Sequence, residues 1–194
     1  MRKIRNRLQQ RLTAQSLRCA VSAKGPALAA PSLHVRPLTR ADRSAVRDLA
    51  LINNMFAPED MTGFDEMLSG YLDATMPEHQ WAVAVSEANP AIQGACYWAP
   101  EPFADRVWNL YFLAVDPAVH GRGAGSALVD HVVTILTSAG ESIARVLIVE
   151  TSSTDSYRRA RHFYLARGFV QEATIREFYG PSDDKIVFWR RISG

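Results

Sequence analysis

The sequence predicts an α/β (α+β) domain in which helices cover both faces of a mixed sheet. Short runs rich in Val, Ile, Phe, Tyr and Trp alternate with longer segments whose apolar residues recur every three or four positions. These patterns give the element order β, α, α, β, β, β, α, β, α, β, β. A chain that combines a hairpin with helical crossovers builds such a sheet. At 194 residues, one domain is expected.

The first half of the domain is predicted to supply a strand, two helices and a hairpin. The strand is expected at residues 33–38, and Thr39 followed by Asp42 is a capping signal for the first helix. Pro58 restarts the chain for a second helix that runs on from Met61. The segments HQWAVAVS and IQGACYWA flank EANPA, which is typical of a strand, a turn and a strand.

The second half begins with a strand at residues 106–115, which is predicted to be buried because RVWNLYFLAV is almost continuously apolar. Helical spacing then joins Ala124, Leu128, Val132, Ile135 and Ala139, and Gly140 ends the pattern. The elements that follow are a buried strand, ARVLIVE, a helix over residues 156–167, and strands over residues 169–178 and 185–191.

Composition and charge restrict the function classes. Apolar residues make up 47% and charged residues 22% of the chain, and no run approaches the ~18 apolar residues of a membrane span. Nine basic residues and no acidic one precede Asp42, which leaves thirteen basic and twenty acidic residues in the rest and disfavours nucleic acid as a partner. Two cysteines provide neither a disulfide framework nor a zinc site, so we expect no metal and a reducing, cytoplasmic location.

Residues 1–31 are expected to be a poorly ordered basic extension, and the domain is placed at residues 32–194. Ile4, Leu8 and Leu12 lie one helical turn apart among arginines, so the segment would form a basic amphipathic helix. An Arg-rich, acid-free start containing ALAA also resembles a mitochondrial transit peptide. Organellar targeting, a docking helix and an over-long start of translation therefore stay open.

Gly121, Gly123 and Gly125 lie between the buried strand and the next helix. Bare backbone there lets a ligand approach, and the free N–H groups of a helix's first turn favour an anion. A P-loop is excluded because no lysine precedes Ser126. A dinucleotide fingerprint would need a glycine at that position; Glu150 is near the place of its acidic residue, but the preceding hairpin weakens this alternative.

The phrase LAVDPAVHGRGAGSALV resembles the acetyl-CoA signature of the GCN5-related N-acetyltransferases (GNAT), which is a buried strand, then Gln/Arg-x-x-Gly-x-Gly/Ala, then a helix. A second phrase, ARHFYLARGF, resembles a later block of the family, carried here by Ala160, Tyr164, Gly168 and Phe169. The resemblance extends from about residue 33 to the C-terminus. It implies a mostly antiparallel sheet of six to seven strands that is splayed in the middle.

The resemblance implies an N-acetyltransferase that uses acetyl-CoA as co-substrate and moves the acetyl group directly to a primary amine of a small molecule or a peptide. Tyr164 would protonate the CoA thiolate, and Glu150 would receive the proton of the amine, with Asp155 as the second candidate. A non-catalytic acyl-CoA-binding or regulatory module of the same fold is the alternative, and a homodimer is compatible with the sequence. The cofactor would contact Leu113, Ala114, Val115, His120, Gly121, Arg122, Gly123, Ala124, Gly125 and Ser126.

Three departures from the family pattern bear on this site. His120 replaces the usual Gln or Arg, which predicts tighter cofactor binding at lower pH, where the imidazole is charged. Tyr157 replaces an asparagine that is common there, and Asn109 stands where some members carry a catalytic glutamate.

The acceptor is expected on the side of the site opposite the cofactor. Four arginines in the last predicted helix are a separate feature. The expected acceptor boundaries are Phe56, Glu59, Met61, Trp98 and residues 179–184. The arginines are Arg158, Arg159, Arg161 and Arg167. They would mostly form a solvated helix face, with the 3′-phosphate of CoA as their alternative partner.

Overall fold

The computed structural model describes residues 33–56, 59, 61–87 and 89–192, and the extension expected over residues 1–31 lies outside them. The strands are β1 (Leu33–Pro37), β2 (Gln80–Ser86), β3 (Asn89–Pro100), β4 (Val107–Val115), β5 (Val146–Ser152), β6 (Val170–Gly180) and β7 (Asp183–Arg191). The α-helices are α1 (Arg43–Ile52), α2 (Met61–Leu72), α3 (Ala124–Ala139) and α4 (Arg158–Ala166). Short 3-10 helices are η1 (Arg40–Asp42), η3 (Pro117–Val119) and η4 (Asp155–Tyr157). The predicted element order is confirmed, and the expected boundaries lie within a few residues of the observed ones.

The described strands form one seven-stranded sheet in the order β1-β2-β3-β4-β5-β7-β6. All neighbouring pairs are antiparallel except β4 and β5, which run parallel. Parallel neighbours need a long crossover, and α3 provides it. The predicted mixed, mostly antiparallel sheet is therefore confirmed.

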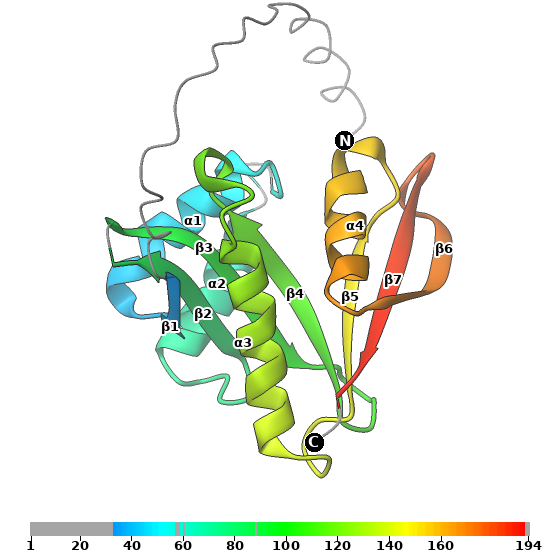
Figure 1. The fold of residues 1–194 in the computed structure, drawn as a ribbon, viewed down its shortest axis with the longest axis horizontal. Coiled ribbons are helices and arrows are strands. Elements are labelled where there is room, and N and C mark those ends of the chain that lie inside the picture. The colour runs from blue at the N-terminus through cyan, green and yellow to red at the C-terminus, as the bar shows by residue number, and fades with distance from the viewer. Residues whose placement is uncertain (1–32, 57–58, 60, 88, 193–194) are drawn as a thin grey trace, which may run out of the picture. The chain divides into compact units, whose positions relative to one another are not determined.

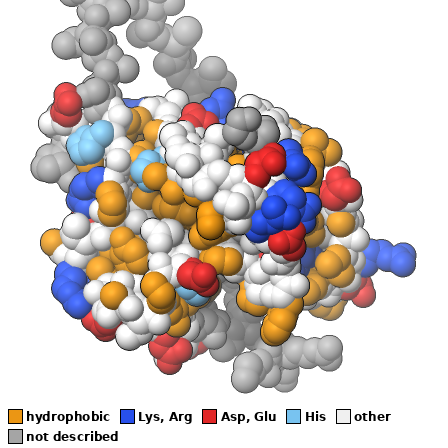
Figure 2. Space-filling model, turned by 90° about the horizontal axis from the view of Figure 1, so that it is seen from below, with side chains coloured by type: hydrophobic (Ala, Val, Ile, Leu, Met, Phe, Trp, Pro, Cys, Tyr) orange, Lys and Arg blue, Asp and Glu red, His pale blue; other side chains and the backbone are white. Residues whose placement is uncertain are grey.

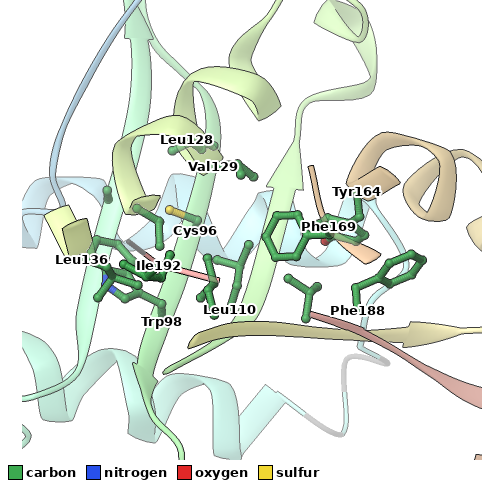
Figure 3. Close-up of a cluster of buried hydrophobic side chains, with 14 of the residues drawn as sticks. Cys96, Trp98, Leu110, Leu128, Val129, Leu136, Tyr164, Phe169, Phe188 and Ile192 are labelled. Carbon is green, nitrogen blue, oxygen red and sulfur yellow. The ribbon is translucent and has the colours of Figure 1, made fainter. Parts of the chain in front are cut away.

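Helices cover both faces of the sheet (Figure 1). On one face, α1 and α2 pack on β2, β3 and β4 in a core that includes Val46, Phe64 and Trp81. On the other face, α3 and α4 pack around Leu128 and Phe188 (Figure 3). We call these the α1/α2 face and the α3/α4 face. The sheet thus buries apolar side chains on both sides, which is the main stabilising contribution in such a fold.

β4 and β5 pair only where both strands begin. Val107–Asn109 lie beside Val146–Ile148, and beyond them the two strands diverge (Figure 1). The register between β3 and β4 shifts at Trp98, which leaves Tyr111 as an extra residue of β4. A β-bulge of this kind bends and twists its strand. The expected splay is therefore present, and among the described strands none pairs with β4 beyond Asn109 on the side toward β5.

The first helical segment starts with the capping arrangement that the sequence predicts. The Asp42 carboxylate accepts hydrogen bonds from the backbone N–H and the hydroxyl of Thr39, both at 2.8 Å. It also forms an ion pair with Arg36 of β1 at 2.6 Å. These contacts, with Arg36 as the largest contributor, lower the pKa of Asp42 to about 2. The carboxylate thereby links the first strand to the first helix.

The set of α3 residues that is buried differs slightly from the set that the sequence predicts. Ala124, Leu128 and Val132 are buried as expected, but Ile135 is 44% exposed and Leu136, at 1%, is buried instead. Positions three and four residues ahead both lie near one face of a helix, so spacing alone does not distinguish them. Packing against the sheet selects Leu136.

The end of the domain at which β4 and β5 converge carries mixed charges. Figure 2 views the domain from the end at which β4 and β5 converge, and acidic and basic side chains lie interspersed there with apolar ones. A mixed surface of this kind has no strong field of one sign to attract a polyanion. Within the described ranges, no helix combines the length and apolarity that a membrane crossing requires.

Candidate functional site

A cavity of about 620 Å³ lies beside the N-terminus of α3. Among the predicted cofactor residues, those that line it are Leu113, Val115, His120, Gly121, Gly123, Ala124, Gly125 and Ser126. The other lining residues are Asn53, Asn54, Met55, Ser156, Tyr157, Arg159, Ala160, Phe163 and Tyr164. The cavity thus brings together the end of β4, the glycine-rich turn, η4 and α4, which are far apart in the sequence.

Two predicted cofactor residues, Ala114 and Arg122, are not among the lining residues. Side chains alternate along β4, so Ala114 packs in the core of the α1/α2 face while its neighbours face the cavity. The backbone N–H of Arg122 donates to the carbonyl of Val119 at 3.2 Å. That N–H is therefore already engaged, unlike those of the helix that follows.

The glycine-rich turn delivers the chain into α3. Gly121 and Gly123 have φ of 80° and 96°, in the left-handed region that other residues occupy only at a cost. Gly123 caps α3, and the N–H groups of Ala124, Gly125 and Ser126 belong to its first turn. First-turn N–H groups have no acceptor within their helix and carry its positive dipole end. This part of the cavity wall therefore suits an anion.

His120 is held through both ring nitrogens. Its Nε2 lies 3.0 Å from the carbonyl oxygen of Val115, and its Nδ1 lies 3.1 Å from Nη1 of Arg159. We therefore assign a neutral imidazole in which Nε2–H donates to the carbonyl and Nδ1 accepts from the guanidinium. In this arrangement His120 holds Arg159 at the cavity wall, and its one N–H is used by the carbonyl of Val115. The prediction of tighter cofactor binding at lower pH stays a prediction.

Tyr164 lies in the core of the α3/α4 face and also lines the cavity. It is 7% exposed, and its ring packs against Phe163, Phe169 and Phe188 with centroids 5.4, 5.7 and 5.6 Å apart (Figure 3). Burial raises the pKa of Tyr164, and the nearby Cys96 thiol raises it further. The hydroxyl therefore keeps its proton at neutral pH, so it is available as a proton donor and not as a base.

Glu150 lies on the opposite face of the sheet from Tyr164. Val149, the preceding residue of β5, packs in the core of the α3/α4 face, and alternation directs Glu150 to the other side. Its carboxylate forms an ion pair with Nζ of Lys185 at 2.8 Å, and the same Nζ lies 3.6 Å from the ring centroid of Phe178. The two predicted catalytic residues are thus separated by the sheet, and Glu150 already has a cationic partner.

Sequence reasoning missed a polar cluster on the α1/α2 face. Oε2 of Glu101 accepts hydrogen bonds from the Tyr111 hydroxyl at 2.7 Å and from Nδ2 of Asn109 at 3.1 Å. Burial raises the pKa of Tyr111, and so does its hydrogen bond to Glu101. A carboxylate therefore lies beside Asn109, at whose position the resemblance noted above implies a catalytic glutamate in some members. No periodicity signals this contact, because it depends on the bulge at Tyr111.

Two expectations about the acceptor side need correction. Trp98 does not form its floor, because the side chain is 3% exposed and packs beside Leu136 and Ile192 on the α3/α4 face (Figure 3). Met61 is 1% exposed and belongs to the core under α2. Burial, with Glu150 nearby, raises the pKa of Tyr179 to about 12. The hairpin between β6 and β7 thus approaches Glu150, whereas the predicted floor is core.

Three of the four arginines in and just after α4 contact other parts of the chain, which a fully solvated helix face would not do. Arg161 donates to the carbonyls of Ser152 and Thr154 at 2.7 and 2.8 Å, and Arg167 forms an ion pair with Asp130 at 3.1 Å. Their positions therefore follow from contacts within the fold. Arg159 alone of the four lines the cavity. Among the described side chains, no group of three or more His, Cys, Asp and Glu is arranged to hold a metal ion.

A family model described as an acetyltransferase (GNAT) domain matches residues 77–171. The match runs from just before β2 to the start of β6, so it includes the splay and most of the cavity wall. A comparison with curated protein sequences found no match.

Solved structures share the fold over most of the chain. A protein assigned to the GNAT family from Desulfovibrio desulfuricans is 26% identical, with a TM-score of 0.74 and coverage of 84% of this chain and 100% of that chain. An aminoglycoside 6′-N-acetyltransferase solved with coenzyme A is 16% identical, with a TM-score of 0.66 and coverage of 83% and 98%. The ribosomal-protein-S18-alanine N-acetyltransferase from Escherichia coli is 17% identical, with a TM-score of 0.65 and coverage of 84% and 96%.

Proposed function

Since this chain belongs to the GNAT family of acetyltransferases, we propose that it moves the acetyl group of acetyl-CoA directly to a primary amine of a small molecule or a peptide. The observation that carries the proposal is the cavity of about 620 Å³ at the glycine-rich start of α3, next to the divergence of β4 and β5. Similar structures solved with coenzyme A and with acetyl-CoA support this choice of co-substrate.

The cavity wall fits the diphosphate of the co-substrate. The first-turn N–H groups of α3 would donate to it, and Arg159 would add a positive charge. The wall also depends on the absence of a side chain at Gly125. A Cβ there would meet Val115 at 3.5 Å and Phe163 at 3.6 Å, and both of these residues line the cavity. The methyl group would therefore occupy space that a ligand needs.

The divergent edge of β4 fits an extended arm. Acetyl-CoA supplies the activated acetyl group, and the backbone of Leu113–Val115 would hold the pantetheine arm as an added strand. One N–H of this segment would polarise the thioester carbonyl. The Val115 carbonyl is already engaged, because it accepts from Nδ2 of Asn53 at 3.2 Å and from His120 at 3.0 Å. The Val115 carbonyl is therefore not available as an acceptor for the arm.

Tyr164 would protonate the departing thiolate. Its burial raises its pKa, so the hydroxyl is protonated at neutral pH. A thiol near pKa ~8.5 is a stronger acid than even an unperturbed phenol near ~10, and the raised pKa of Tyr164 widens this difference, so the proton must move as negative charge develops on sulfur and not afterwards. Tyr164 lies on the cavity side of the sheet, which suits a role at the leaving group.

CoA release tests the proposal. Wild-type protein and Tyr164→Phe would be given acetyl-CoA with spermidine, tyramine, kanamycin or a peptide that begins with Ala, and the free thiol followed with a dye. We expect amine-dependent release whose kcat falls about 100-fold in Tyr164→Phe, because a general acid contributes about 10²–10⁴-fold. Acetyl-CoA affinity and thermal unfolding, measured in parallel, should stay close to wild type.

Two other outcomes would change the proposed function. Binding of acetyl-CoA without amine-dependent release from any acceptor would identify a non-catalytic acyl-CoA-binding or regulatory module. Binding of NAD and not of acetyl-CoA would contradict both the transferase and the module.

A further inference from the structure

A polar cluster lies on the α1/α2 face, at the vertex where β4 leaves β5. Glu101 follows β3, and its backbone N–H donates to the carbonyl of Val107 at 2.7 Å, which fixes it against the first residue of β4. Its carboxylate oxygen Oε2 accepts from the Tyr111 hydroxyl at 2.7 Å and from Nδ2 of Asn109 at 3.1 Å. Two side chains of β4 therefore orient this carboxylate.

The charge of Glu101 is not neutralised by the part of the chain that the structure describes. No cationic side chain there forms an ion pair with it, and its second oxygen, Oε1, has no hydrogen-bond partner there. Glu150 differs, because Lys185 lies 2.8 Å from its Oε2. Of the two carboxylates near the vertex, Glu101 is therefore the one left to attract a cation from solution.

Asn109 indicates that the cluster lacks a donor. Its side chain is 2% exposed, and its Oδ1 is buried without a hydrogen-bond partner among the described residues. Buried acceptors are nearly always paired, and an exception needs an explanation. A bound group with several N–H donors would supply both Oε1 of Glu101 and this cluster with the hydrogen bonds that they lack.

An aromatic ladder ends at the same place. Trp81, Tyr97 and Tyr111 stack one on the next, with centroids 4.8 and 5.6 Å apart. Trp81 is 1% exposed, whereas Tyr111, the outermost ring, is 45% exposed. An aromatic ring attracts a cation at its face, and here the ring stands beside an uncompensated carboxylate. Both features select a positively charged group.

The cluster also adjoins the proposed reaction site. Asn109 and Ile148 form the last pair between β4 and β5, and Tyr111 and Glu150 each lie two residues beyond it. Glu150 is close enough to raise the pKa of Tyr111. The cluster thus borders the opening of the splay from the face opposite the cavity.

We propose that Glu101, oriented by Asn109 and Tyr111, binds the reacting amine of the acceptor, and that the acceptor is a primary amine that arrives as a cation. This inference rests on the proposed acetyltransferase function. Glu101 takes one proton from the ammonium group and passes it to water, which frees the nitrogen lone pair to form the new N–C bond. As the C–S bond breaks, Tyr164 donates its proton to the thiolate and is restored by the second proton that the nitrogen loses.

Glu101→Gln tests the assignment, because it removes the charge but keeps an oxygen for Tyr111. The probe is whichever of spermidine, tyramine and kanamycin the wild type acetylates fastest, with aniline as an acceptor that is uncharged at neutral pH. We expect kcat/KM for the cationic amine to fall about tenfold or more, in line with the loss of a charge-assisted hydrogen bond. The loss for aniline should be smaller, and the Kd of acetyl-CoA should not change. Glu87→Gln is the matched control, because Glu87 is exposed at the opposite end of β3.

The outcomes separate this inference from the proposed function. If the wild type is active and Glu101→Gln keeps its kcat/KM, the transferase stands and the assignment of Glu101 is wrong. Equal losses for the cationic amine and aniline would indicate a structural role and would also overturn it. A larger loss in Glu150→Gln than in Glu101→Gln would move the amine site to Glu150. If the wild type acetylates no amine, the proposed function fails and the assignment fails with it.

Discussion

The two faces of the sheet differ in charge where β4 and β5 diverge. On the α3/α4 face, the cavity is bordered by glycines, by the first-turn N–H groups of α3 and by Arg159. On the α1/α2 face, the vertex carries the carboxylates of Glu101 and Glu150 beside Tyr111. β4 contributes to both sides, because its side chains alternate and its bulge adds one residue. One irregular strand is thus enough to separate a surface suited to an anion from a surface suited to a cation.

Glu101 and Glu150 differ in that only Glu150 has a cationic partner among the described residues, and Lys185→Met should remove that difference with the largest effect on stability. Lys185 is 9% exposed and pairs with Glu150 at 2.8 Å, so its loss leaves a partly buried carboxylate without a partner. We expect the free energy of unfolding to fall by about 2–3 kcal/mol, less than for a fully buried pair. Glu150 would then also be free to attract a cationic acceptor, which should lower KM for the amine.

Urea unfolding and amine kinetics would check both effects. Lys185→Arg is the control, because it keeps the charge near Glu150. A Lys185→Met protein as stable as wild type would show that the pair contributes little, and the contrast between the two carboxylates would lose its basis.

The ion pair of Asp42 with Arg36 involves neither the cavity nor the vertex, so a change there should alter stability without altering ligand binding. The pKa of Asp42 is lowered to about 2, first by its hydrogen bond to Arg36 and then by those from Thr39. Because the folded value lies below the unfolded value of about 3.9, the stabilisation is present above about pH 4 and is lost as the pH falls through 2. Asp42→Asn should cost about 2 kcal/mol at pH 7 and progressively less below pH 4.

Urea unfolding of wild type and Asp42→Asn at pH 7 and pH 2.5 measures this difference. Acetyl-CoA affinity of the folded variant at pH 7 should equal that of wild type. A stability difference that persists unchanged at pH 2.5 would contradict the assigned ion pair.

The elements of the fold could be predicted from the sequence because each depends on local patterns. Apolar periodicity, the Thr39 and Asp42 cap and the helix stop at Gly140 act over a few residues, and all three occur in the structure. The splay needed the resemblance to a family, because no local pattern signals that two strands stop pairing. The choice between Ile135 and Leu136 also depends on the sheet beneath the helix.

The candidate site was predictable only where it is continuous in sequence. The glycine-rich turn is one segment, so its residues were found together. The hydrogen bond between His120 and Arg159 joins two elements, and the ion pair of Glu150 with Lys185 depends on the register of β5 against β7. The contact of Glu101 with Tyr111 further requires a bulge. Tertiary geometry of this kind decides which charges are neutralised, and it leaves no periodic signal.

Arg159 tests whether the cavity on the α3/α4 face binds the anionic part of acetyl-CoA. It lines the cavity, and His120 accepts from its Nη1 at 3.1 Å. Arg159→Gln should weaken acetyl-CoA binding about tenfold, with a smaller dependence on salt, because a charged donor to the phosphates is lost. Arg158→Gln is the matched control, since Arg158 is exposed on the same helix and does not line the cavity. Isothermal titration at two salt concentrations measures both, and equal affinities for the two variants would contradict a role for Arg159.

Gly125→Ala is expected to have the smallest effect, and it tests whether the cavity wall itself binds the ligand. A Cβ at Gly125 would make ordinary contacts, with Val115 at 3.5 Å and Phe163 at 3.6 Å, and alanine favours a helix by up to about 1 kcal/mol over glycine. Stability should therefore stay the same or rise, while acetyl-CoA affinity falls by less than about tenfold because the methyl group narrows the cavity. Gly123→Ala is the contrasting variant, because a φ of 96° makes alanine strained there and stability should fall. Thermal unfolding and acetyl-CoA titration of both proteins separate backbone strain from narrowing of the cavity. If Gly125→Ala binds acetyl-CoA as tightly as wild type, the ligand does not lie against this turn, and the anion-binding surface of the sheet must lie elsewhere.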